Sequence, residues 1–207
     1  SEIISARMLI AELATLGVEV DLDYVARHFL GRSYPTVMAQ IRRDFSLDLP
    51  GNFEDGYRAR LLAAFARDLK VMPGAAAVLE SLSMPRCVAT SSSPHRVEQS
   101  LRMTGLWPLV GAAVFTASEV ANGKPAPDLF LHAAARMGVD PDRCLVIEDS
   151  LTGIRAARAA GMEVWRFVGG SHLGETAAPE PPDAMPQLRF ASFDQFFHID
   201  PRIRKHP

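Results

Sequence analysis

The residues whose types and spacing could do chemistry are a lysine in a tight turn and a pair of carboxylates that ends an apolar run. Lys124 lies in the sequence GKPAPD, and Glu148 and Asp149 follow the apolar sequence CLVI. A fixed cation and an acidic metal ligand at the ends of neighbouring strands suit phosphate esters, because the negative charge of the ester must be neutralised before a nucleophile approaches. The pattern therefore indicates chemistry on a phosphate group.

The elements that must position these residues alternate between helices and short strands. We predict helix 75–82, strand 86–90, helix 95–103, strand 112–116, helix 128–137, strand 144–148, helix 153–160, strand 163–168 and an edge strand at 188–190. The strands are apolar without alternation, as expected where helices cover both faces of a sheet. Residues 171–187 are predicted to form an irregular loop and residues 202–207 a frayed tail. The fold class is α/β, with a doubly wound parallel (Rossmann-like) core.

This topology gathers polar side chains at one edge of the sheet. Thr90 ends one predicted strand, Thr116 ends the next with Lys124 soon after, and Glu148 and Asp149 end a third. Ligands of such sheets bind beyond the carboxyl ends of the strands. The convergence of the three strand ends therefore indicates a site more strongly than any single residue does.

Each of these residues, taken singly, also has an ordinary structural interpretation. Thr90 could be a strand-end hydroxyl that caps the following helix, and Lys124 could be an exposed turn lysine. Glu148 and Asp149 could simply begin the next helix, where the helix dipole favours carboxylates.

The first third of the chain has helical patterns and no convincing strand. We predict helices over 4–16, 22–29, 37–45 and 53–69. This favours a four-helix unit at residues 5–68, inserted between residues 1–4 and the α/β core at residues 69–207.

Composition excludes several classes of function. Apolar residues make up 48% of the 207 residues and the net charge is −2, so the chain can form a core and shows no basic face for nucleic acid. Cys87 and Cys144 lie in apolar runs and are predicted to be small buried thiols in a reducing compartment. With no membrane span or signal pattern, we expect a cytoplasmic protein, a monomer or weak dimer, that binds neither nucleic acid nor a membrane.

These residues resemble the haloacid dehalogenase-like phosphohydrolases from residue 1 to about residue 170. The likeness is strongest to the subfamily with a four-helix cap, which includes sugar-phosphate phosphatases, phosphoglycolate phosphatases and β-phosphoglucomutase. The resemblance implies that Thr90, with Ser91 beside it, binds the transferring phosphoryl group and that Lys124 pairs with phosphate and nucleophile. It also implies that Glu148 and Asp149 hold Mg²⁺, and that the substrate is a small phosphorylated metabolite such as a sugar or sugar-acid phosphate.

The catalytic aspartates of that family have no counterpart where they are expected. In the family, an aspartate at the end of the first core strand attacks phosphorus and a second, two residues later, is the general acid and base. The chain opens at Ser1-Glu2, which resembles the residues just after that motif. We therefore expect the first, central strand to be missing from these residues, with about 15–25 further residues ahead of them. An intact mass equal to that of the 207 residues would contradict this, and the chain alone would then be inactive.

Asp21 and Asp23 have the spacing of the missing pair. Only Val18 and Val20 precede them as strand material, and a helix follows inside the predicted cap. We therefore interpret Asp21 as a helix N-cap.

Selectivity in the resembling family depends on the cap. The sequence GRSY at 31–34 matches the cap loop that approaches the active site, so Arg32 and Tyr34 are the candidate selectivity residues, with Arg7 and His28 as weaker ones. The structural alternative is an ordinary connection between two helices. An arginine here would suit an acidic or phosphorylated sugar.

Two other functions stay open. A β-phosphoglucomutase has a histidine where Ser5 stands and a lysine where Ser93 stands, and both differences favour transfer to water. A non-catalytic module of the same fold that binds a phosphorylated ligand is the second alternative.

Overall fold

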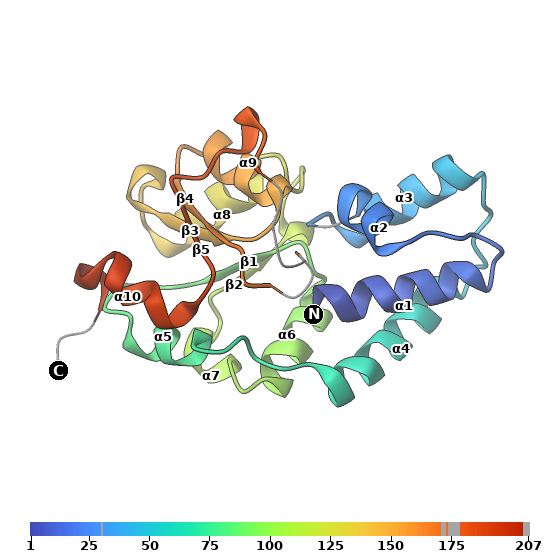
Figure 1. Cartoon of the computed structure of the whole chain (residues 1–207), viewed down its shortest axis with the longest axis horizontal. Helices are drawn as coiled ribbons and strands as arrows, with labels where there is room; N and C mark the ends of the chain where they lie inside the picture. Colours follow the sequence, from blue (N-terminus) through green and yellow to red (C-terminus); the bar gives the residue numbers. More distant parts are fainter. Residues whose placement is uncertain (30, 171–172, 174–178, 205–207) are drawn as a thin grey trace.

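The computed structural model describes residues 1–29, 31–170, 173 and 179–204. One side of the molecule consists of helices α1 to α4, and the strands with the other helices form the other side (Figure 1). The helices are α1 (Glu2–Ala14), α2 (Leu22–His28), α3 (Tyr34–Phe45) and α4 (Phe53–Asp68). These confirm the four helices predicted from sequence, although the predicted boundary at residue 5 falls inside α1.

The four helices share one hydrophobic cluster. Leu13 of α1, Ile41 of α3 and Phe65 of α4 are almost completely buried in it, and α1 and α4 lie side by side (Figure 1). The side chain of Asp21 accepts a hydrogen bond from the backbone N–H of Tyr24 at 2.7 Å and caps α2. The N-cap interpretation of Asp21 is therefore confirmed.

The predicted alternation of helices and strands is also confirmed. The elements are α5 (Ala75–Ser81), β1 (Val88–Thr90), α6 (Pro94–Met103), α7 (Trp107–Val110), β2 (Val114–Thr116), α8 (Asp128–Met137), β3 (Leu145–Glu148), α9 (Leu151–Ala159), β4 (Glu163–Phe167), β5 (Leu188–Phe190) and α10 (Phe196–Ile199). The sequence did not predict α7 and α10, because one helical turn is too short to show a period.

All strand pairs are parallel, but they form two sheets. β1 pairs with β2, and β3, β4 and β5 form a second sheet in that order. Among the described residues β1 and β3 do not pair, so the single sheet expected from sequence is divided between them.

The side chains of the second sheet alternate between two hydrophobic clusters. Val146 and Val164 face a cluster with α8 and α9, whereas Trp165 and Phe167 face an aromatic cluster with α5 and α10. Because both faces are covered, the strands are apolar at consecutive positions.

The predicted frayed tail is wrong for its first residues. Ile203 is buried in the aromatic cluster, and its carbonyl accepts hydrogen bonds from the backbone N–H and the hydroxyl of Ser83. A single apolar residue in a polar tail gives too little periodicity to predict this docking. Residues 205–207, and residues 171, 172 and 174–178 of the predicted loop, lie outside the described residues.

Both cysteines are free thiols. They were predicted to be buried, but Cys87 is exposed and Cys144 is half-buried. Within the described part of the chain, no helix is both long enough and apolar enough to cross a lipid bilayer.

Candidate active site

Lys124 is a buried cation between the ends of β1 and β3. Its Nζ lies 2.6 Å from Glu148 Oε2 and 3.4 Å from the carbonyl oxygen of Ala89, and its side chain is 7% exposed. The ammonium also lies 4.7 Å from the centre of the Phe130 ring. The turn before α8 therefore brings the predicted lysine to the predicted carboxylate, and excludes the exposed-lysine alternative.

Glu148 is held by hydrogen bonds on both carboxylate oxygens. Oε1 accepts from the backbone N–H groups of Asp149 and Ser150, both at 3.1 Å, and from the Ser150 hydroxyl at 2.9 Å. Burial acts to raise the pKa of Glu148, but Lys124 and these hydrogen bonds outweigh it and hold the pKa well below that of an ordinary glutamate. Glu148 is therefore ionised at neutral pH.

The start of α9 is built around this carboxylate. Ser150 caps the helix by accepting a hydrogen bond from the backbone N–H of Gly153 at 3.1 Å. A Cβ on Gly153 would lie 2.1 Å from the carboxylate carbon of Glu148, so only glycine fits there. The helix-start interpretation of this segment is correct, and it coexists with the contact to Lys124.

The hydroxyls at the end of β1 have local partners. Thr90 Oγ1 accepts a hydrogen bond from the backbone N–H of Ser92 at 3.1 Å, in the turn before α6. The N-cap residue of α6 is Ser93, so this bond is not the helix cap considered from sequence. Ser91 donates to the carbonyl oxygen of Gly31 at 3.0 Å. Thr116, at the end of β2, forms a capping box with Glu119. From the segment that follows β2, it is Lys124 that reaches the other two strand ends.

The loop between α2 and α3 reaches the strand edge through its backbone. Gly31 has φ of +75°, and a Cβ there would lie 2.3 Å from Thr152 Oγ1 and 2.6 Å from Ser150 Oγ. Together with the hydrogen bond from Ser91, this places the helical unit against the residues that hold Glu148. The loop therefore lies against the strand edge, as the sequence predicted.

The four cap residues considered from sequence lie in different places. Arg32 donates from Nη1 to Oε1 of Gln40 at 3.0 Å, and His28 Nδ1 lies 3.4 Å from the amide nitrogen of Gln40. Arg7 is exposed on α1. The ring of Tyr34 packs against the helical cluster and stacks on the ring of Tyr57, with 5.6 Å between the ring centres.

The Tyr34 hydroxyl is buried and has no hydrogen-bond partner among the described residues. Burial raises the pKa of Tyr34 above its ordinary value, so the hydroxyl stays neutral. A role for Tyr34 in substrate selectivity stays a prediction.

Sequence reasoning missed Arg96, which joins the two parts of the molecule. Arg96 lies on α6 and donates from Nη2 to the hydroxyl of Ser5 on α1 at 2.8 Å, with Glu2 at 3.9 Å. Its guanidinium also lies 5.3 Å from the ring centre of Phe65 on α4. The sequence carries no signal for this residue, since Ser5 stands 91 positions earlier.

The carboxylates at this edge match the donor chemistry of Mg²⁺. Within the part of the chain that the structure describes, no group of three or more His, Cys, Asp or Glu residues could hold a metal by itself. Mg²⁺ is commonly bound by one or two carboxylates together with water and substrate phosphate oxygens. Asp149, next to an ionised Glu148, fits that requirement.

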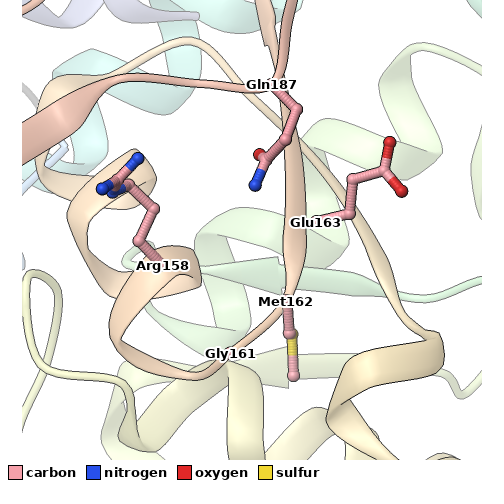
Figure 2. Close-up of a pocket in the computed structure, with 5 residues that line it drawn as sticks. All are labelled: Arg158, Gly161, Met162, Glu163 and Gln187. Atoms are coloured by element: carbon pink, nitrogen blue, oxygen red, sulfur yellow. The ribbon is translucent and has the colours of Figure 1, made fainter.

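A cavity of about 430 Å³ lies elsewhere, lined by Arg158, Gly161, Met162, Glu163 and Gln187. Figure 2 shows these residues around the beginning of β4. Glu163 begins β4, whereas Glu148 is in register with Arg166 near its end. The cavity is therefore at the edge opposite Lys124 and contains none of the predicted site residues.

Comparison with protein families decides the classification. The model of the haloacid dehalogenase-like hydrolases matches residues 4–161. The chain belongs to the haloacid dehalogenase-like hydrolase family. This confirms the family resemblance, and hydrolases of this family generally use Mg²⁺.

Named relatives of this hydrolase include phosphatases. The 6-phosphogluconate phosphatase of Escherichia coli is 26% identical over 173 residues, which cover 83% of this chain and 78% of that protein. A haloacid dehalogenase-like protein of unknown function from Agrobacterium tumefaciens is 31% identical, with a TM-score of 0.76 over 97% of this chain and 91% of the other. A family hydrolase from Deinococcus radiodurans, solved with bound phosphate and sodium, is 30% identical, with a TM-score of 0.72 over 96% of this chain and 88% of the other.

Proposed function

We propose that this hydrolase is a Mg²⁺-dependent phosphatase that acts on a small phosphate monoester, a phosphorylated sugar or sugar acid. The observation that carries the proposal is the buried contact of Lys124 with Glu148 at the strand edge, next to the end of β1. A buried lysine at this place supplies a fixed positive charge for a phosphate group, and family relatives named as phosphatases support the same reaction class.

In this proposal, the residues at the strand edge have separate tasks. Lys124 neutralises the charge of the transferring phosphoryl group, and Thr90 and Ser91 donate hydrogen bonds to its oxygens. Asp149, backed by Glu148, holds Mg²⁺, which when bound would stabilise negative charge on the phosphate oxygens. Glu148 also fixes the position of Lys124, since the two form a short ion pair.

The nucleophile proposed is an aspartate on a strand ahead of α1, which the family resemblance places in the centre of the sheet. The facing edges of β1 and β3 have no strand partner among the residues that the structure describes, and such a strand would pair with both. The aspartate oxygen would form a bond to phosphorus while the bond from phosphorus to the sugar oxygen breaks. The leaving oxygen would take a proton from the second aspartate, and water would then release phosphate.

We further propose that residues 5–68 act as a cap over this site and that residues 1–4 and 69–207 form the core. The contact of Gly31 with Ser91 and Ser150 supports the cap, because it lies directly beside the proposed phosphate and metal residues.

Release of inorganic phosphate from a panel of sugar phosphates and phosphorylated sugar acids, measured with the natural full-length protein, tests the proposal. Turnover is expected with Mg²⁺ and should be lost in EDTA and regained when Mg²⁺ is added. Lys124→Met should abolish it, whereas Lys70→Met, at an exposed position, should not. A protein that binds these compounds without releasing phosphate would instead favour the non-catalytic module, and equal turnover in EDTA would refute the metal requirement.

A further inference from the structure

A buried glutamine on α3 has no role in the reaction proposed above. Gln40 is 7% exposed and lies on the face of α3 that otherwise buries Val37, Met38 and Ile41. Burial of an amide is unfavourable unless its hydrogen bonds are made, so an apolar residue would serve the core better if packing were its only task. Its hydrogen bonds therefore indicate what Gln40 does.

The amide of Gln40 connects the cap loop to the surface of α3. Its Oε1 accepts from Arg32 Nη1 at 3.0 Å, and its Nε2 donates to Asp44 Oδ2 at 3.1 Å. Because an ionised carboxylate can only accept, the NH₂ group must face Asp44 and the carbonyl oxygen must face Arg32. Hydrogen bonds, first of all the one from Gln40, lower the pKa of Asp44, so its carboxylate is ionised.

Asp44 is itself held in place. The hydroxyl of Tyr24 donates to Oδ2 at 3.1 Å and Arg43 Nε donates to Oδ1 at 3.2 Å. A continuous set of hydrogen bonds thus runs from Tyr24 on α2 through Asp44 and Gln40 to Arg32. Such connected polar groups restrict one another's orientation.

Arg32 stands directly after the residue that touches the proposed active site. The carbonyl of Gly31 accepts from Ser91, and its Cα lies against Ser150 and Thr152. The bond to Gln40 uses an N–H of one terminal nitrogen of Arg32 and leaves other N–H groups of the guanidinium fork. A guanidinium fixed in this way is suited to bind a carboxylate with two hydrogen bonds.

We propose that Gln40 is a positioning residue that holds Arg32 at the cap side of the active site, where Arg32 binds the carboxylate of a phosphorylated sugar acid. This inference rests on the proposed phosphatase function and deepens it. The substrate would carry two anionic groups, with its phosphate at Lys124 and its carboxylate at Arg32.

The test compares two probes that differ only at the far end of the molecule. 6-Phosphogluconate ends in a carboxylate, and glucitol 6-phosphate has the same six-carbon chain with a hydroxymethyl group in its place. The natural full-length protein should have the higher kcat/KM for 6-phosphogluconate. Gln40→Leu should lower kcat/KM for this compound about tenfold through KM, as expected for one hydrogen bond to a charged group, and leave that for glucitol 6-phosphate within about twofold.

Two further variants separate positioning from structural damage. Arg32→Met should show the same loss, and adding Gln40→Leu to Arg32→Met should cause no further loss, because Gln40 acts through Arg32. Ile41→Val, which removes a methylene group from the same buried face of α3, should leave the ratio of kcat/KM for the two probes unchanged. Equal losses for both probes after Gln40→Leu, or a further loss in the Arg32→Met background, would overturn the proposal.

Asp44→Ala covers the case in which Gln40→Leu does not fold. The side chain of Asp44 is 29% exposed, and its removal frees the amide of Gln40 to turn over. The selectivity ratio should then fall in the same direction by a smaller factor, and an unchanged ratio would count against the proposal.

Failure of the proposed phosphatase function can be told apart from failure of the positioning role of Gln40. If neither probe is hydrolysed, the phosphatase proposal fails, and the same variants are compared by the Kd for each probe in isothermal titration calorimetry. A preference for 6-phosphogluconate that depends on Gln40 and Arg32 would still support the positioning role. Equal affinity for the two probes, or no binding of either, would refute it.

Discussion

Removal of the positive charge at Lys124 is the most direct test of how this site is held together. The Nζ–Oε2 distance of 2.6 Å and exposures of 7% and 9% describe a buried ion pair. The Coulomb energy of the two charges is about 6 kcal/mol at an effective dielectric constant of about 20. Removal of one partner of such a buried pair costs about 3–5 kcal/mol of stability. Lys124→Met should therefore lower the free energy of unfolding by about 3–5 kcal/mol in urea titrations with EDTA present, whereas Lys70→Met should change it by less than about 0.5 kcal/mol.

The difference in the free energy of unfolding between wild type and Lys124→Met should depend on pH. In the wild type the pKa of Glu148 is lowered, so the pair stabilises the fold above the ordinary glutamate value of 4.5 and this contribution disappears as the pH falls through the lowered value. Without Lys124, burial prevails and raises the pKa of Glu148. The folded variant then keeps a proton that the unfolded chain has lost, so its stability falls as the pH rises above 4.5, by up to about 1.4 kcal/mol per pH unit.

A double-mutant cycle with Glu148→Gln isolates the pair. The double variant should be more stable than the sum of the single losses predicts, by about 3 kcal/mol, because no uncompensated charge remains. A difference between wild type and Lys124→Met that is the same at pH 4.5 and pH 7.5, or additive single losses, would refute this account of the site.

Three further substitutions test other contacts. Gly31→Ala and Gly17→Ala both place alanine at a φ near +75°, at a cost of about 1–2 kcal/mol, but only the alanine at position 31 meets side chains of the α/β part. In urea titrations, Gly31→Ala should therefore lower the free energy of unfolding clearly more than Gly17→Ala does. Equal losses would contradict the loop contact. Arg96→Met should increase amide hydrogen exchange in α1 and α4, because Arg96 bridges α6 to these helices. Arg102→Met, which removes an exposed ion pair on the same helix α6, should not. Equal exchange in the two variants would exclude the bridging role. Glu180→Gln should lower the free energy of unfolding by about 3 kcal/mol, since Glu180 forms a 2.6 Å ion pair with the buried Arg166 and its side chain is 4% exposed. A loss below about 0.5 kcal/mol would show that the pair contributes nothing.

Local signals allowed much of the fold to be predicted. The bounds of α8 and β5 were predicted to the residue, and Asp21 was recognised as an N-cap because a short acidic side chain before a helical pattern has a known physical role. Lys124 and Glu148 were placed at one edge of the sheet from sequence, because parallel strands deliver their ends to one edge, but their ion pair was not predicted.

Other features depend on contacts between distant segments and have no local signal. Tyr34 was predicted to be a selectivity residue of the cap loop, whereas its stacking on Tyr57 depends on how α3 packs on α4 and was not predicted. Thr116 looked like another strand-end hydroxyl, yet Glu119 three residues later draws it into a capping box. Gln40 was not considered, because a single polar residue in a helical pattern is normally placed on the surface, and its partner Arg32 lies outside that helix.

The hydrogen bond from Ser91 to Gly31 sets up a competition. A serine hydroxyl has one proton, and in this structure that proton is donated to a backbone carbonyl of the cap loop. A phosphate group that accepts the same proton must displace the carbonyl, so anion binding and this contact are mutually exclusive at Ser91. By thermodynamic linkage, this hydrogen bond weakens the binding of inorganic phosphate at Ser91 by the same factor by which bound phosphate weakens the hydrogen bond.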